Sequence, residues 1–349
     1  MESAATYLRD EVKLAKAVEL YSQKAPGATF SSPDVDAALQ LYFDSTADIN
    51  TLAQLWGMGF VMICDLPDKN KSGNIFIGPY CGCFFSLPGK TPVPFMSVAF
   101  KGTNFADIGE GIVDFVYDTF KAPADRLFGA NVSTGVYDSL FSQFDINQKI
   151  VSPWALIQET LADVAKLMPK GTNPIIHVTV RSPISARKAA RTHTAQGHSL
   201  GASYSCFCFA QLLTDLKPTR NSGQLGDIYN FGCPRVGYSD WSELFHNAME
   251  SHKGTSVRVV NEKDLVPQLV PLIFRDSPPY YNHIDSGWNV FPNAPPQVIE
   301  TERGTAPPAL DWIWDWASDL SDHCMVPETS FEEDLANYVE QILGAITLL

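Results

Sequence analysis

The stretch Gln196-Gly197-His198-Ser199-Leu200-Gly201-Ala202 contains the pattern G-x-S-x-G. That pattern is typical of a nucleophile elbow, a sharp strand-to-helix turn that lifts a serine Oγ out of a sheet and aims the next backbone N–H groups at the same point. Gly197 and Gly201 flank the turn because a Cβ at either position would clash with the strand or the helix. The stretch therefore predicts a fold of sheet and helices with Ser199 as its nucleophile.

The residues on either side of the turn fit this interpretation. Residues 189–195 can end in a short buried strand. Residues 202–213 are apolar with small side chains at the start, which suits a helix packed closely on a sheet. A short pattern of this kind also occurs by chance, so the alternative is a glycine-rich turn with an idle serine.

The length of 349 residues fits one large α/β domain or two small ones, and the composition argues against some partners. Hydrophobic residues make up 45% of the 349 residues, which is ample for a packed core. The 25 Lys and Arg against 39 Asp and Glu give a net charge of −14, which argues against nucleic acid as a partner and against electrostatic docking on anionic membranes. A neutral substrate is the simplest fit, although an acidic surface also serves solubility alone.

The chain shows no segment expected to cross or target a membrane. Gly, Pro or a charge interrupts every apolar stretch before the roughly 18 residues that a transmembrane helix needs. Residues 1–11 lack the basic start and apolar run of a signal peptide. We therefore expect a protein that stays in the cytoplasm or, if a leader is missing from the sequence, one that is secreted.

The seven cysteines are expected to be mostly free, buried thiols, because their number is odd and their neighbours are apolar. Two pairs, in Cys81-Gly82-Cys83 and Cys206-Phe207-Cys208, look like metal ligands at first sight. Neither pair has the C-x-x-C spacing of a structural zinc site, so core packing is the expected role. The sequence predicts neither a metal site nor an organic cofactor.

Hydrophobic periodicity predicts alternating helices and strands. Spacings of three and four predict helices over residues 7–22, 33–55 and, with Pro153 resetting the register, most of 135–167. Apolar runs predict strands over residues 60–64, 74–77, 95–100, 227–231, 256–260 and 280–284, and the proline-rich residues 292–308 are expected to be irregular. Strands that alternate with helices imply a mostly parallel or mixed central sheet with helices on both faces.

A serine nucleophile needs a histidine base and a carboxylate that orients the base. When the serine lies on this kind of elbow, the acid and then the histidine follow it along the chain. Asp264 follows the strand expected over residues 256–260, so it lies at the carboxyl edge of the sheet, where active sites form. Glu262, Asp276 and Asp285 are weaker candidates, and a loop aspartate that caps a turn is the alternative for Asp264.

The same chain order leaves two histidines as candidates for the base. His283 lies in the strand expected over residues 280–284, where a histidine is more often a satisfied core or edge residue. His323 lies in a loop ahead of the helix expected over residues 331–348, and a loop can carry the ring back over the sheet edge. We therefore assign the base to His323, with His283 as the second choice.

The oxyanion that forms during acyl transfer needs hydrogen-bond donors held in place beforehand. One is the backbone N–H of Leu200, directly after the nucleophile. The other comes from the loop after the strand at residues 95–100, where Gly102 permits a tight backbone and Thr103 offers both an N–H and a hydroxyl. The alternative for Thr103 is an N-cap of the segment that follows.

An amphipathic segment follows Thr103. Phe105, Ile108 and Ile112 recur at helical spacing on an apolar face, and two glycines soften the segment. Beside the oxyanion loop, such a segment fits a lid that opens on a lipid surface and contacts the substrate. An ordinary surface helix is the alternative.

With these residues placed, the chain resembles the fungal-type (class 3) lipases of the α/β-hydrolase superfamily. Segments that match the family's pattern in order lie at the oxyanion loop, the elbow, the run F-G-x-P-R-V-G and the acid loop, which are residues 98–103, 196–202, 229–237 and 258–269. The resemblance covers residues 57–325 and implies one α/β-hydrolase domain. Residues 1–55 would be a helical extension packed on that core, and residues 326–349 a C-terminal helix.

The resemblance implies a carboxylic ester hydrolase, above all a triacylglycerol lipase, that needs no cofactor. Ser199, Asp264 and His323 would form the triad, Thr103 and Leu200 the oxyanion hole, and the segment from Asn104 the lid. The substrate would be a lipid or another ester at an oil–water interface. The alternatives are a phospholipase, a feruloyl-type esterase or an acyltransferase on the same scaffold, and a catalytically silent lipid-binding protein.

The chain departs from the family pattern at two places. Lys101 replaces the arginine that is more usual before the glycine of the oxyanion loop, and residues 174–188 form a longer and more polar approach to the elbow. Secreted members usually have a leader and disulfides, neither of which is evident here. These differences bear on localisation more than on chemistry.

Overall fold

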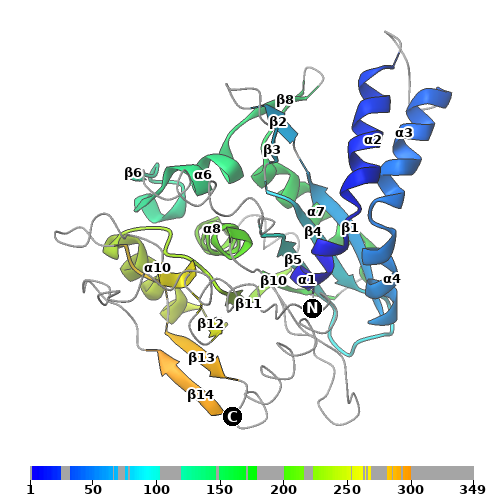
Figure 1. The fold of residues 1–349 in the computed structure, drawn as a ribbon. Helices are drawn as coiled ribbons and strands as arrows, with labels where there is room; N and C mark the ends of the chain where they lie inside the picture. The colour runs from blue at the N-terminus through cyan, green and yellow to red at the C-terminus, as the bar shows by residue number, and fades with distance from the viewer. Residues whose placement is uncertain are drawn as a thin grey trace.

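The fold centres on a mixed β-sheet covered by helices (Figure 1). The computed structural model describes residues 2–24, 32–65, 67–69, 75–77, 79–102, 119–146, 149–169, 172–178, 200–215, 223–252, 254–261, 264, 266–268, 281–284, 286–291 and 294–299. Within these ranges, eight strands form the main sheet in the order β1-β4-β5-β10-β11-β12-β13-β14. Their bounds are Met58–Cys64 (β1), Cys81–Ser86 (β4), Phe95–Phe100 (β5), Ile175–Val178 (β10), Gln224–Phe231 (β11), Ser256–Asn261 (β12), Gly287–Phe291 (β13) and Ala294–Ile299 (β14).

The middle of the sheet is parallel and its edges are antiparallel. β5, β10, β11, β12 and β13 pair in parallel, with Val178 opposite Val98. β1 and β4 on one side and β14 on the other join antiparallel. The predicted mixed sheet is therefore confirmed. Because parallel strands end at the same edge, the chain after β5, β10 and β12 emerges along one rim.

Short hairpins and helices surround the sheet. The hairpins pair Pro67–Lys69 (β2) with Ile75–Ile77 (β3), Thr119–Lys121 (β6) with Asn131–Ser133 (β7), and Phe144–Ile146 (β8) with Lys149–Val151 (β9). The α-helices span Glu2–Ala5 (α1), Glu11–Ser22 (α2), Pro33–Asp44 (α3), Ala47–Leu55 (α4), Thr134–Phe141 (α6), Pro153–Leu167 (α7), Leu200–Thr214 (α8) and Ser239–Ser251 (α10). Single 3-10 turns span Thr6–Leu8 (η1), Leu127–Gly129 (η3) and Val266–Gln268 (η4).

Strand β5 is buried on both faces, as expected for a central strand. Met96, Val98 and Phe100 point into the larger core, which α7 and α8 share. Phe95 and Ala99 point into a smaller core on the opposite face, under α1 and α4. The period-two alternation of β5 therefore puts helices on both sides of the sheet and leaves its carboxyl end held between two cores.

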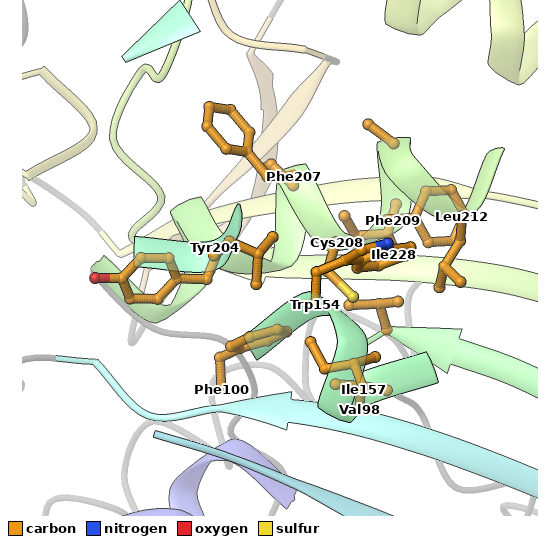
Figure 2. Packing of buried hydrophobic residues seen from close by; sticks show 14 of the residues in the cluster. Val98, Phe100, Trp154, Ile157, Tyr204, Phe207, Cys208, Phe209, Leu212 and Ile228 are labelled. Atoms are coloured by element: carbon orange, nitrogen blue, oxygen red, sulfur yellow. The ribbon is translucent and has the colours of Figure 1, made fainter. Parts of the chain in front are cut away.

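Helix α8 is the central helix of the larger core. It is apolar on nearly every side, and Phe207 and Phe209 are both fully buried, as a helix of that composition requires. Figure 2 shows Tyr204 beside Phe100 of β5, and Trp154 of α7 in the same cluster. This packing sets the direction of α8 and aims its N-terminus at the carboxyl rim of the sheet.

The helical N-terminal region is confirmed with two breaks. Residues 33–55 form α3 and α4 with an interruption at Ser45 and Thr46, and α2 begins at Glu11 with Asp10 as its N-cap. The carboxylate of Asp10 accepts the Lys13 backbone N–H at 2.9 Å. An N-cap side chain of this kind favours the start of a new helix. This explains why residues 7–22 do not form one continuous helix.

Helix covers most of residues 135–167, as predicted, but a hairpin that the sequence did not predict interrupts it. The hairpin β8–β9 separates α6 from α7. Ser152 caps α7, its Oγ accepting the Ala155 backbone N–H at 3.1 Å, and Pro153 occupies the first helical position. Proline lacks the N–H that a continuing helix needs, so it begins α7 instead of resetting a longer helix.

Two predictions near the end of the described chain were also wrong. Residues 281–284 form no sheet strand, although Tyr281 bridges Tyr238, and the next strand of the sheet is β13. Part of the proline-rich segment expected to be irregular forms β14, which includes Pro295 and Pro296. β14 pairs on one side with β13, and an edge strand tolerates proline because its outer N–H groups have no ladder to join.

Candidate active site

Helix α8 begins at Leu200, the residue directly after Ser199. Its second residue, Gly201, packs against the backbone that follows β5. A Cβ on Gly201 would lie 2.8 Å from the carbonyl carbon and oxygen of Lys101 and 2.9 Å from the nitrogen of Gly102. Glycine at this position is therefore required by close backbone approach, as the elbow pattern predicts. The elbow helix and the predicted oxyanion loop are in contact.

The loop after β5 also forms a backbone hydrogen bond with Tyr80, which precedes β4. Lys101 and Gly102 are both buried, and the Lys101 backbone N–H donates to the Tyr80 carbonyl at 3.0 Å. The first N–H groups of α8 have no partner within the helix, so the N-terminus of α8 is suited to stabilise negative charge. The Leu200 N–H belongs to this turn, while Thr103 lies outside the described residues.

Asp264 lies beyond the carboxyl end of β12, where the sequence predicts it. Its side chain is buried, with 1% of the residue exposed, and Oδ1 accepts the Val266 backbone N–H at 2.9 Å. β12 lies two strands from β10 in the sheet, so Asp264 shares the carboxyl rim with the start of α8. Burial and the hydrogen bond from the Val266 N–H hold the carboxylate in one orientation.

The acid loop is anchored through the carbonyl of Pro267. This oxygen accepts from the Arg235 guanidinium at 3.0 Å and from His283 Nε2 at 3.0 Å. Arg235 belongs to the run Phe231-Gly232-Cys233-Pro234-Arg235-Val236-Gly237 and is itself buried. From sequence alone that run matches a family pattern but has no assigned role. Its structural role includes fixing the loop that carries Asp264.

Glycines explain the shape of this run. Gly232 has a φ of +52°, a left-handed conformation that favours glycine, and its N–H donates to the Val259 carbonyl of β12 at 3.0 Å. A Cβ on Gly237 would lie 2.7 Å from Trp241 Cγ and 2.8 Å from the Asn131 carbonyl oxygen. The run therefore links β12 to α10 through contacts that only a glycine backbone allows.

His283, the second candidate for the base, is a buried structural residue. Its ring donates from Nε2 to the Pro267 carbonyl, and its own carbonyl accepts from Ser242 Oγ at 2.6 Å. Burial, reinforced by the nearby charges of Arg258 and Arg235, holds the pKa of His283 well below the ordinary value. A neutral ring with its Nε2 proton committed to a carbonyl serves as a fixed donor.

The other described histidines also have structural partners. His177 Nδ1 accepts the Asp227 backbone N–H at 3.2 Å, and burial lowers the pKa of that ring. His252 Nε2 lies 2.7 Å from the Gly226 carbonyl, and His246 Nε2 lies 3.2 Å from Glu250 Oε1. His193, His198 and the predicted base His323 lie outside the described residues.

Several further predicted residues also fall outside the described part of the chain. These are Ser199 itself and the predicted lid contacts Phe105, Ile108 and Ile112. Cys206 and Cys208 are buried in the core, as are the other cysteines that the structure describes. Within the same ranges no group of three His, Cys, Asp or Glu side chains is arranged to hold a metal ion. No helix among the described residues is long and apolar enough to cross a membrane.

Comparison with known proteins finds lipases. The protein "Secreted mono- and diacylglycerol lipase 1" from Fusarium solani is 30% identical over 118 residues, which are 32% of this chain and 32% of that protein. The match thus spans about a third of that relative's length. The Rhizomucor miehei lipase–propeptide complex has a TM-score of 0.46 at 19% identity, with 93% of this chain and 79% of that chain covered. The Lip2 lipase of Yarrowia lipolytica has a TM-score of 0.47 at 14% identity, with 90% of each chain covered.

The family assignment rests on a longer match. Residues 97–274, just over half of the 349 residues, match the family described as Lipase (class 3). This range includes residues 97–100 of β5, the Lys101–Gly102 backbone, the start of α8, Arg235 and Asp264. The mixed sheet with helices on both faces is the α/β-hydrolase architecture, and the chain belongs to the class 3 lipase family.

Proposed function

We propose that this protein is a serine ester hydrolase that cleaves acylglycerols. Ser199 is the nucleophile, His323 the base and Asp264 the acid, and the Leu200 and Thr103 backbone N–H groups form the oxyanion hole. Phe105, Ile108 and Ile112 line a lid over the acyl chain. The observation that supports this proposal is the contact between Gly201, the residue after Leu200, and the Lys101–Gly102 backbone, which directly precedes Thr103.

The proposed reaction has two steps. Ser199 Oγ attacks the ester carbonyl while the imidazole of His323 takes its proton, and the carbonyl oxygen becomes an oxyanion beside the start of α8. The imidazolium then protonates the departing alcohol, and water hydrolyses the acyl-enzyme by the same route. Asp264 stabilises the imidazolium, and its burial strengthens that interaction because little water screens it.

Acylglycerols are proposed as substrates on two grounds. The family is one of lipases, and the Fusarium relative is named as a mono- and diacylglycerol lipase. The net charge of −14 also suits a neutral ester better than an anionic phospholipid head group. We propose that the enzyme binds its substrate at an oil–water interface. We also propose that the protein is secreted, as the name of the Fusarium relative states for that protein.

Labelling with a fluorophosphonate tests the nucleophile directly. The probe is expected to attach to Ser199, and Ser199→Ala is expected to abolish both labelling and hydrolysis of short-chain nitrophenyl esters while the melting temperature stays within about 2 °C, since a lost hydroxyl changes little packing. Absence of an adduct on Ser199 in a folded protein would instead favour a silent lipid-binding protein.

A substrate series then separates the ester classes. Tributyrin, longer triacylglycerols, phosphatidylcholine and feruloyl esters are compared below and above the concentration at which each aggregates. We expect the rate with triacylglycerols to rise sharply once droplets form. A preference for phosphatidylcholine or for the feruloyl ester would contradict the acylglycerol assignment and leave the serine mechanism intact.

A further inference from the structure

A buried ion pair ties the N-terminal helices to the sheet. Arg9, between η1 and α2, pairs through its guanidinium with the carboxylate of Asp65, which directly follows β1. Both side chains are 1% exposed, and Arg9 also lies 4.5 Å from the centre of the Tyr80 ring. Burial raises the pKa of Asp65, and the charge of Arg9 opposes that rise. Charges buried this deeply hold their partners in a narrow geometry.

The same N-terminal segment reaches the predicted oxyanion loop. Lys101 Nζ lies 2.5 Å from Glu11 Oε1 at the start of α2, and Arg9 lies 3.7 Å from the same oxygen. The Lys101 side chain is only 7% exposed, and the Glu11 carboxylate contributes to the charge compensation that a buried ammonium needs. The Lys101 backbone N–H donates to the Tyr80 carbonyl, and the Lys101 ammonium pairs with Glu11. The residue is therefore held through both its backbone and its side chain.

Lys101 is also the residue whose carbonyl faces Gly201 of the elbow helix. Only Gly102 separates it from Thr103, the proposed oxyanion donor. An oxyanion donor acts only if it is held at hydrogen-bond distance from the developing charge, so a small shift of Lys101 weakens the transition state more than the ground state. The side chain of Lys101 that pairs with Glu11 is therefore separated by a single residue from the proposed oxyanion donor.

We propose that Glu11 and Lys101 are positioning residues: their ion pair, braced by Arg9 and Asp65, holds the loop that carries Thr103 against the elbow. The N-terminal helices are therefore part of the machinery that prepares the oxyanion hole. This inference rests on the proposed ester hydrolase function. It extends that function to a segment outside residues 97–274, the range matched to the family.

Steady-state kinetics of Glu11→Gln, Lys101→Met and Lys101→Arg test the pair. The first two are expected to lower kcat about tenfold or more with KM within about twofold, because a misplaced oxyanion donor costs transition-state binding alone. Lys101→Arg restores most of kcat, since arginine also reaches Glu11. The double variant Glu11→Gln with Lys101→Met is expected to be no slower than the worse single variant, because both remove one interaction.

The exposed pair of Lys13 with Asp10, 3.1 Å apart on the same helix, supplies the control, and Lys13→Met should leave kcat unchanged. Unchanged kcat in both Glu11→Gln and Lys101→Met, with a lowered melting temperature, would show a purely structural pair and overturn the inference. A wild-type protein that folds but takes no fluorophosphonate on Ser199 overturns the proposed function, which is a different outcome.

A second inference comes from the length of chain between β10 and α8. β10 ends at Val178, opposite Val98, and α8 begins beside Lys101, three residues further along the neighbouring strand. At about 3.3 Å per residue this advance is about 10 Å, which four extended residues can bridge. The chain instead has residues 179–199 between the two elements.

Seventeen of those residues differ in charge from the rest of the protein. Residues 180–196 read VRSPISARKAARTHTAQ, with four of the 25 basic residues and no acidic residue in a chain whose net charge is −14. Without them, Thr179, Gly197, His198 and Ser199 alone join Val178 to Leu200. That link is a sharp strand-to-helix turn, which is what a nucleophile elbow requires.

The ends of this segment suggest its origin. Every valine codon begins with GT, and a glutamine codon can read CAG, so the coding sequence from Val180 to Gln196 can have the ends of a spliceosomal intron. We infer that residues 180–196 are read through from an intron. The active protein then joins Thr179 directly to Gly197.

Sequencing of the messenger RNA and of tryptic peptides from the source organism tests this origin. We expect a transcript and a peptide in which Thr179 is followed by Gly197. A native protein that yields the peptide of residues 182–187, with no shortened transcript, would overturn the inference. This readout does not depend on the proposed activity.

Fluorophosphonate labelling of the full chain and of the variant lacking residues 180–196 tests its consequence. The shortened chain is expected to label at Ser199 at least about tenfold faster, because its elbow is preorganised. Equal labelling rates of the two chains would overturn the inference. An adduct on Ser199 in neither chain would instead overturn the proposed function.

Discussion

The carbonyl of Lys101 lies where Gly201 allows no side chain, 2.8 Å from the position that a Cβ would take. The atoms that a Cβ would meet are backbone, which cannot rotate away as a side chain can. Gly201→Ala is therefore expected to push α8 and the Lys101–Gly102 backbone apart. We expect a loss of about 1–3 kcal/mol in unfolding free energy, measured by urea titration, and a fall in kcat of about tenfold or more.

Gly89→Ala is the matched control for that substitution. Gly89 has a φ of +73°, but a Cβ at this residue would meet no heavy atom within 4 Å, so alanine there costs about 1–2 kcal/mol in backbone strain without moving the site. Its kcat should stay at the wild-type value. A Gly201→Ala protein as active as Gly89→Ala would contradict the close packing of elbow and oxyanion loop.

Asp264→Asn tests the acid. The amide oxygen can still accept the Val266 N–H, so the fold is preserved, but an amide cannot stabilise the imidazolium or hold the required tautomer. We expect kcat for nitrophenyl esters to fall on the order of 10³-fold or more with little change in melting temperature. The exposed Asp163→Asn provides the comparison and should leave kcat unaltered.

Arg235→Met tests the anchor of the acid loop. It removes the buried donor to the Pro267 carbonyl, so we expect a loss of about 1–3 kcal/mol in unfolding free energy together with a lowered kcat. Arg235→Lys keeps the charge but not the planar fork, and should recover part of both quantities. Full activity in a destabilised Arg235→Met protein would show that the anchor does not affect the acid.

His283 should make stability depend on pH. Its folded pKa is lowered, so below the unfolded value of about 6.5 the unfolded chain takes up a proton that the folded chain refuses. Stability is therefore expected to fall as pH drops below that value, by at most about 1.4 kcal/mol per pH unit from this group. In His283→Gln, whose amide also donates to Pro267, the urea midpoint should vary less between pH 7.5 and pH 5.

The same variant separates the two candidate bases. His283→Gln should retain hydrolysis, because the ring of His283 is committed to the Pro267 carbonyl, whereas His323→Ala should abolish it. The reverse pattern would assign the base to His283 and would require the acid loop to rearrange.

Local patterns predicted the elements that local chemistry controls. The apolar run of residues 95–100 predicted β5 because a strand buried on both faces has no polar side, and the G-x-S-x-G glycine at 201 predicted a close approach that the structure shows. Predictions were wrong where pairing decides the outcome. Pro295 and Pro296 disfavour a strand by propensity, yet β14 forms because β13 offers a ladder on one side.

Chain order and residue type predicted that Asp264 directly follows a strand, and the structure has it beyond β12, while its role as the acid stays a prediction. No sequence pattern indicated that Glu11 pairs with Lys101, that Arg9 pairs with Asp65, or that Arg235 holds Pro267. These pairs join residues far apart in sequence, and their geometry exists only once the sheet brings them together. Periodicity reports which face of an element is buried, whereas the partner of a buried charge depends on the packing of the whole chain.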